Sequence, residues 1–209
     1  MQFRFQMLMI TAILASACGE QAPEMAAYDP AHDYFSFANT DQFATEHLAL
    51  DLTVDFEKEE LRGSAIHRMR RIDSAATEII FDTRDLDVTD VRVLMADGSS
   101  EAVDFRFGET NAIEGSPLIV SLPEDSDSAT VLRLKLQYAT SPDSTALQWL
   151  PATLTAGGEY PLMFSQSQAI HARSWVPLQD TPAVRMTYEA TIRTPPELLA
   201  VMSANNDPL

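Results

Sequence analysis

The feature that most constrains the fold is the alternation of apolar and polar residues from His47 to Phe56. The even-numbered positions from 48 to 56 are all Leu, Val or Phe, whereas positions 51, 53 and 55 are Asp or Thr. Neighbouring side chains on a β-strand point to opposite faces, so this pattern predicts a strand with one buried and one solvated face. A helix is disfavoured, because its apolar residues recur every three or four positions.

Other short segments alternate in the same way or form brief apolar runs between turn residues. They predict strands at residues 61–72, 78–82, 86–95, 103–107, 116–122, 132–138, 184–192 and 199–202. Asp97-Gly98 is a favoured hairpin dipeptide, and Gly63 predicts a bulge or a close backbone approach. Since no segment is a convincing amphipathic helix, the sequence predicts an all-β sandwich or curved sheet.

Known catalytic and metal-binding motifs are missing from the sequence. The four histidines are scattered, none forms a His-Glu-x-x-His motif, and no Gly-x-Ser-x-Gly elbow is present. We therefore expect no metal site and no catalytic residue in this chain. His47 and His67 are interpreted as surface residues of strands. Arg68, Arg70 and Arg71 are interpreted as a solvated face that pairs with nearby acidic residues.

The net charge of −17 argues against a nucleic-acid partner, because phosphate binding needs clustered Lys and Arg. The simplest interpretation of this charge is solubility.

The N-terminal segment has the order of a secretory signal. Arg4 precedes an apolar run and the small residues Ala15-Ser16-Ala17, and the run is too short to span a bilayer. We expect residues 1–17 to be a signal peptide, 18–45 a tether and 46–209 a β domain. Ala-Ser-Ala-Cys resembles a bacterial lipoprotein box, which predicts lipidation of Cys18 and an exported protein, periplasmic or membrane-anchored. The alternative is ordinary cleavage nearby, with Cys18 lost or free.

The stretch from Phe164 to Pro182 differs from the strands around it, because it combines prolines, a tryptophan, a histidine and three glutamines. If residues 164–169 are extended, Gln166 and Gln168 project from one face, where their carbonyl groups could accept hydrogen bonds from an ammonium ion. The alternative is a buried loop whose glutamines satisfy backbone groups. Asp180-Thr-Pro182 predicts a turn held by the Asp side chain, with Trp175 and Pro177 as its packing.

The same stretch, Phe-Ser-Gln-Ser-Gln-Ala-Ile-His-Ala-Arg-Ser-Trp-Val-Pro-Leu-Gln-Asp-Thr-Pro, closely resembles the N-terminal domain of the gluzincin zinc aminopeptidases. The closest branch is the one that contains leukotriene hydrolase and its bacterial relatives. Segments 47–56, 81–86, 140–150 and 200–204 support the resemblance. Relatives often carry Cys at the positions of Ser167, Ala172 and Leu178, and their absence fits an exported protein that avoids free thiols.

The resemblance implies a saddle-shaped, mostly β domain that precedes a catalytic domain. The zinc ligands and the catalytic Glu and Tyr belong to that later domain, which this sequence lacks. By the same match, Gln168 binds the free α-amino group of a peptide substrate, Gln166 lies beside it, and Ala169 is in the segment that contacts the first substrate residue. The predicted function is therefore the N-terminal domain of a zinc metallo-aminopeptidase, inactive alone. The alternative is a non-catalytic, membrane-tethered β-sandwich that binds a partner.

Overall fold

The computed structural model describes residues 29, 32–123 and 130–206. The chain separates into residues 1–32 and a compact unit that begins at Asp33, and the elements described below all belong to the second unit. The predicted signal peptide, Cys18 and the first part of the predicted tether lie outside the described residues. Within the described ranges, no helix has the length and apolar character needed to cross a bilayer.

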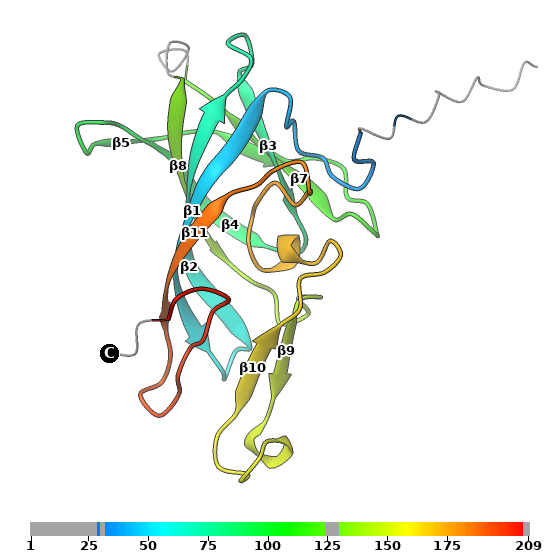
Figure 1. The fold of residues 1–209 in the computed structure, drawn as a ribbon, viewed down its shortest axis with the longest axis vertical. Helices are drawn as coiled ribbons and strands as arrows, with labels where there is room; N and C mark the ends of the chain where they lie inside the picture. The colour runs from blue at the N-terminus through cyan, green and yellow to red at the C-terminus, as the bar shows by residue number, and fades with distance from the viewer. Residues whose placement is uncertain (1–28, 30–31, 124–129, 207–209) are drawn as a thin grey trace, which may run out of the picture. The chain divides into compact units, whose positions relative to one another are not determined.

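Six strands form one mixed sheet in the order β11-β1-β2-β8-β4-β5 (Figure 1). All neighbours in this sheet are antiparallel except β1 and β11, which run parallel. The strands are β1 (Phe43–Asp55), β2 (Glu60–Arg71), β4 (Asp87–Leu94), β5 (Ser100–Ala102), β8 (Val131–Ala139) and β11 (Thr187–Arg193). The predicted turn at Asp97-Gly98 joins β4 to β5, as its sequence indicated.

The alternation in β1 sets which face of the sheet is buried. Leu48, Leu50, Leu52 and Val54 are all buried, whereas Asp51 and Thr53 between them are exposed. β8 follows the same rule, since Leu132, Leu134, Leu136 and Tyr138 are buried. Each fully buried Leu side chain contributes about 1.5–3 kcal/mol to folding, so a one-residue slip of either strand would forfeit its whole apolar face.

A second sheet covers the apolar face of the first. It contains β3 (Glu78–Thr83), β7 (Ser116–Ser121) and β6 (Phe105–Phe107) in the order β3-β7-β6, all antiparallel. Ile79, Phe81, Leu118 and Val120 from this sheet share one buried cluster with the inward residues of β1, β2 and β8. The predicted all-β architecture is confirmed, with the core between the large sheet and this smaller one.

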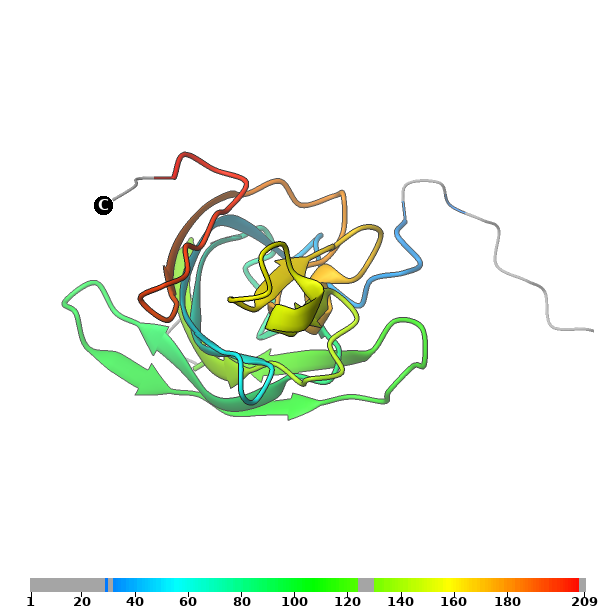
Figure 2. The same cartoon turned by 90° about the horizontal axis from the view of Figure 1, so that it is seen from below.

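A two-stranded hairpin, β9 (Leu147–Leu150) and β10 (Leu162–Ser165), was not predicted from the sequence. Conversely, residues 199–202 form no strand. Short 3-10 helices occur at Ala152–Leu154 (η2), between the two hairpin strands, and at Ala172–Ser174 (η3). Figure 2 shows the strands of the large sheet curving around the hairpin and the following segment, drawn in yellow and orange.

Two predictions about β2 are wrong. His67 is fully buried, because it lies on the same inward face as Ala65 and Met69, and its ring packs 4.7 Å from that of Phe81. Arg71 is also buried, with its guanidinium 5.6 Å from the Phe43 ring centroid. Arg68 and Arg70 behave as predicted, since both pair with Glu46 on the solvated face.

Gly63 allows a close backbone approach rather than a bulge. It lies opposite Leu52, and a Cβ atom at this position would lie 2.0 Å from the carbonyl oxygen of Asp51. The irregularity in the β1–β2 pairing occurs elsewhere, between Thr45 and His47.

Candidate functional site

The Gln166–Ala169 segment follows β10 directly and leaves the hairpin at its open end. The Gln166 amide donates a 2.8 Å hydrogen bond to the carbonyl of Ala146, which continues the pairing one residue beyond the strand. The chain then turns, and the His171 amide donates a 2.9 Å hydrogen bond to the carbonyl of Ser167. Residues 164–169 are therefore extended only in their first part, because Gln168 lies in the turn, so the condition for both glutamines to project from one face of a strand is not met in full.

Gln166 and Gln168 are both exposed to solvent, as is Ala169, which follows a cis peptide bond. The two glutamines are linked, since the side-chain oxygen of Gln166 accepts a 3.3 Å hydrogen bond from the backbone N–H of Gln168. Among the described residues, no hydrogen bond engages the side chain of Gln168. The side-chain amide of Gln168 is thus available to an incoming ligand.

The third glutamine of this stretch, Gln179, has the structural role that the alternative interpretation assigned to all three. It is buried, its side-chain oxygen accepts a 2.8 Å hydrogen bond from the Thr45 amide, and its side-chain nitrogen donates to the Phe43 carbonyl at 2.8 Å. Burial therefore separates one glutamine that satisfies the interior from two that face solvent.

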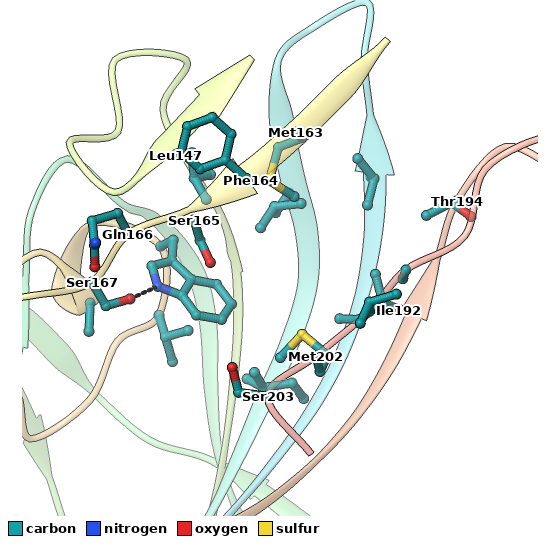
Figure 3. A pocket seen from close by; sticks show the side chains of 18 of the residues that line it. Leu147, Met163, Phe164, Ser165, Gln166, Ser167, Ile192, Thr194, Met202 and Ser203 are labelled. Carbon is teal, nitrogen blue, oxygen red and sulfur yellow. Dashed lines mark hydrogen bonds between the residues drawn. The ribbon is translucent and has the colours of Figure 1, made fainter. Parts of the chain in front are cut away.

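A pocket of about 720 Å³ opens beside Gln166 and Ser167 (Figure 3). Its walls come from the apolar face of β1, from β10 and from the segment that follows β11. Most of the lining is apolar, and includes Leu48, Leu50, Phe56, Met163, Trp175, Tyr188 and Met202. Gln166, Ser167 and Ser203 add polar groups to the lining. Apolar walls with a few polar groups are typical of a ligand or substrate site. Gln168 and Ala169 do not line this pocket.

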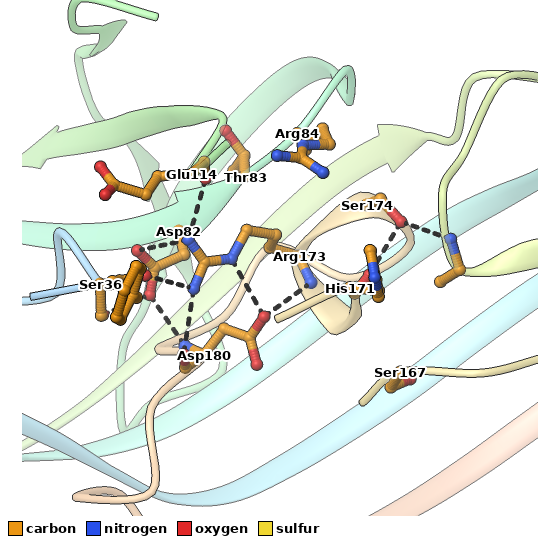
Figure 4. A network of polar contacts seen from close by, with 12 residues as sticks. Ser36, Asp82, Thr83, Arg84, Glu114, Ser167, His171, Arg173, Ser174 and Asp180 are labelled. Carbon is orange, nitrogen blue, oxygen red and sulfur yellow. Dashed lines mark hydrogen bonds and ion pairs between the residues drawn. The ribbon is translucent and has the colours of Figure 1, made fainter. Parts of the chain in front are cut away.

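A buried ion network holds the base of the same stretch (Figure 4). Arg173 in η3 is completely buried, and its Nε donates a 3.0 Å hydrogen bond to Asp180 Oδ2. Its other nitrogens donate to the backbone carbonyls of Glu114, Phe35 and Asp180 at 2.8–3.1 Å. One side chain thus joins three separate segments of the chain. The prediction that Asp180 holds its own turn is wrong, because its carboxylate binds Arg173 instead.

Asp82 in β3 completes this network. Its carboxylate accepts hydrogen bonds from the Ser36 hydroxyl at 2.6 Å, the Phe37 amide at 2.7 Å and the Asp180 amide at 2.9 Å, and lies 3.7 Å from Arg173 Nη1. Burial raises the pKa of Asp82, while these donors and the charge of Arg173 act in the opposite direction. The network links residues 35–37, β3 and the 164–182 stretch.

Metal binding by this part of the chain is not supported. The described residues contain no group of three His, Cys, Asp or Glu side chains that could hold an ion. His171, next to the glutamine segment, instead lies 2.9 Å from the Thr145 hydroxyl through Nδ1.

A protein-family model, the Peptidase M1 N-terminal domain, matches residues 44–207. The chain belongs to the M1 peptidase family. The chain is 37% identical over 183 residues to leucine aminopeptidase 2 of Pyricularia oryzae, covering 87% of this chain and 28% of that protein. It also superimposes on yeast leukotriene A4 hydrolase with a TM-score of 0.71 and 36% identity, over 81% of this chain and 26% of that one.

A two-domain M1 zinc metallopeptidase shares the fold with a TM-score of 0.53 at 22% identity, over 74% of this chain and 33% of that one. The chain therefore spans roughly a quarter to a third of the length of the relatives compared, and matches the N-terminal domain of the family. The predicted family and fold are confirmed.

Sequence reasoning missed the contacts that hold the candidate site in place. Arg173 contacts Phe35, which lies 138 positions away, and Asp82 contacts Asp180, which lies 98 positions away. Trp175 lies only eight positions from Ser167, but no local motif predicts the hydrogen bond between them. A weak signal existed for Arg173, since it is the one Lys or Arg residue between Phe164 and Pro182.

Proposed function

We propose that this domain forms the substrate-anchoring wall of a zinc aminopeptidase that removes N-terminal residues from peptides. In this proposal the Gln168 carbonyl accepts a hydrogen bond from the substrate's α-ammonium group, with Gln166 beside it and Ala169 next to the first substrate residue. The observation that carries the proposal is the exposure of two neighbouring glutamine amides on a segment whose base is fixed by buried hydrogen bonds.

The chemistry suits recognition of a peptide N-terminus. An amide oxygen accepts hydrogen bonds from an ammonium group but carries no full charge, so it orients the substrate without a strong ion pair. A site that requires a free α-amino group selects chain ends over internal peptide bonds. The backbone hydrogen bond between Gln166 and Ala146 holds the glutamine segment in a fixed position, which such a selection requires.

The zinc ion of the family does not fit the described residues, because they offer no ligand set. In the proposed function this domain therefore binds and orients the substrate, and the ligands for zinc come from elsewhere in the full-length aminopeptidase. No chemical step is assigned to the residues of this chain.

The test is the kinetic effect of Gln168→Ala in the full-length aminopeptidase that carries this domain. Loss of one charge-assisted hydrogen bond should cost about 1–3 kcal/mol in kcat/KM for unblocked peptides, roughly 5- to 150-fold. Gln148→Ala is the matched control, because Gln148 is also an exposed glutamine at this hairpin, opposite Phe164 in the β9–β10 pairing. Unchanged kinetics in Gln168→Ala would remove this residue from the site. Absence of an in-frame His-Glu-x-x-His sequence from the gene would favour a non-catalytic binding module.

We also propose that the protein is exported and tethered to a membrane through a lipid on Cys18. The support is the order of residues 1–18, which resembles a lipoprotein signal, although Leu14 lies one position earlier than in the usual pattern. Intact-mass measurement of the membrane fraction should show a chain that begins at a diacylated Cys18. A membrane-bound chain with an unmodified Cys18 would exclude the lipid anchor.

A further inference from the structure

Ser167 lies between the two exposed glutamines and is the anchored residue of this segment. Its carbonyl accepts the His171 amide at 2.9 Å, and its hydroxyl accepts a 3.1 Å hydrogen bond from the indole Nε1 of Trp175. The dashed line in Figure 3 marks this second contact. Within the described residues, it is the one side-chain hydrogen bond that ties positions 166–169 to the rest of the fold.

Trp175 is well placed to act as an anchor. Its ring packs against the buried core cluster and lines the 720 Å³ pocket, so it contacts both the interior and the cavity beside the glutamines. Its own backbone is fixed at the end of η3, where the Trp175 amide donates to the Ala172 carbonyl at 3.0 Å. The next residues behind it, Arg173 and Ser174, are fully buried.

The neighbouring buried hydroxyls make this anchor rigid. Ser174 Oγ donates to the His171 carbonyl at 2.8 Å and accepts the Ala146 amide at 3.0 Å. The Ala146 carbonyl also accepts a hydrogen bond from the backbone N–H of Gln166. Ala146 therefore holds both the start of the glutamine segment and Ser174, the residue before Trp175. The indole N–H then fixes the middle of the segment from the pocket side.

We propose that Trp175 is a positioning residue, which holds Gln166 and Gln168 in their binding geometry through the hydroxyl of Ser167. This inference rests on the proposed function, since it assigns a task to the segment only if the glutamines bind the substrate amine. Trp175 acts through Ser167 and performs no chemistry itself. The physical reason is that an exposed amide anchors a ligand well only when its backbone cannot shift.

The hydrogen bond itself can be tested in the 209-residue chain. The chain has two tryptophans, Trp149 and Trp175, so Trp149→Phe assigns the indole N–H resonance of Trp175 in a proton–nitrogen NMR spectrum. Ser167→Ala should move that resonance and speed its exchange with solvent, whereas Ser167→Thr, which keeps the hydroxyl, should leave both close to wild type. An unchanged indole resonance in Ser167→Ala would overturn the proposal.

The positioning role is tested in the full-length aminopeptidase with Trp175→Phe, Ser167→Ala and Ser167→Thr. Trp175→Phe and Ser167→Ala should each lower kcat/KM for unblocked peptides about three- to tenfold, the range expected for one neutral hydrogen bond. Their double variant should be no worse than the more affected single variant, because both remove the same contact. Ser167→Thr should restore activity to within about twofold of wild type.

A Gln168→Ala background separates positioning from general loss of structure. If Trp175 acts through the glutamine, Trp175→Phe should have less than about a twofold further effect once Gln168 is gone. A full further effect in that background would overturn the positioning role. If Gln168→Ala alone changes nothing, the proposed function fails. If Gln168→Ala lowers kcat/KM while Ser167→Ala does not, the function stands and the positioning inference fails.

Discussion

Replacement of His67 by Gln should change how the stability of this domain depends on pH. The His67 ring is fully buried, with Nε2 3.0 Å from the Pro177 carbonyl and Nδ1 3.4 Å from the Thr45 hydroxyl. Because a carbonyl can only accept, Nε2 carries the proton of the neutral ring. Burial lowers the pKa of His67 from 6.5 to about 4, and the hydrogen bond to Pro177 offsets this only in part.

The direction of the effect follows from proton binding. Between pH 6.5 and 4 the unfolded chain takes up a proton on His67 that the folded chain does not, so stability falls as pH is lowered through this window. Above pH 6.5 both states are neutral and the effect vanishes. The loss from this one group is about 2 kcal/mol between pH 7.5 and 5.0, and about 3 kcal/mol once pH falls below 4.

Urea unfolding of the chain at pH 7.5, 6.5, 5.5 and 5.0 measures this difference. Wild type should lose about 2 kcal/mol more than His67→Gln over this range, although the variant should be less stable at pH 7.5 because it loses packing against Phe81. His67→Phe, a second variant that cannot titrate, should show the same flattened profile. Parallel stability curves for wild type and both variants would refute the assignment of a buried neutral imidazole.

Three further outcomes are expected. Arg173→Met should destabilise the domain by about 3–5 kcal/mol in urea unfolding, because it leaves the carboxylates of Asp82 and Asp180 without their buried cation, and adding Asp82→Asn should recover part of the loss. Gly63→Ala should cost at least about 2 kcal/mol in the same assay, since its Cβ would clash with a backbone carbonyl, whereas Gly157→Ala, which meets nothing within 4 Å, should cost only about 1–2 kcal/mol of backbone strain. The 209-residue chain with added zinc should not hydrolyse amino-acid amides, and zinc-dependent turnover that copurifies with it would contradict this.

The parts of the fold that could be predicted from the sequence are the strands whose pattern of burial is repeated in the order of their residues. The strands β1 and β8 alternate along most of their length, because each has one face on the core and one in water, and this period is visible in the sequence. The hairpin β9–β10 gave no such signal. β10 is exposed or half-buried at every position, so burial imposes no alternation on it. His67 was misplaced for a related reason, because a polar residue on the inward face of β2 looks like a residue of the solvated face.

The candidate site was predictable in its composition but not in its support. Gln166 and Gln168 stand out as closely spaced amides, yet nothing local shows that Gln179, a few residues later, is buried and bonded to Thr45 across the fold. The distinction arises only when β1 and the 164–182 stretch come together. The role of Trp175 was missed for a different reason. Its partner Ser167 is only eight positions away, but a tryptophan in a sequence does not reveal whether its indole N–H has a hydrogen-bond partner. The residue types thus mark a candidate segment, and the family resemblance implies its role, whereas the groups that hold the segment in place follow only from tertiary contacts.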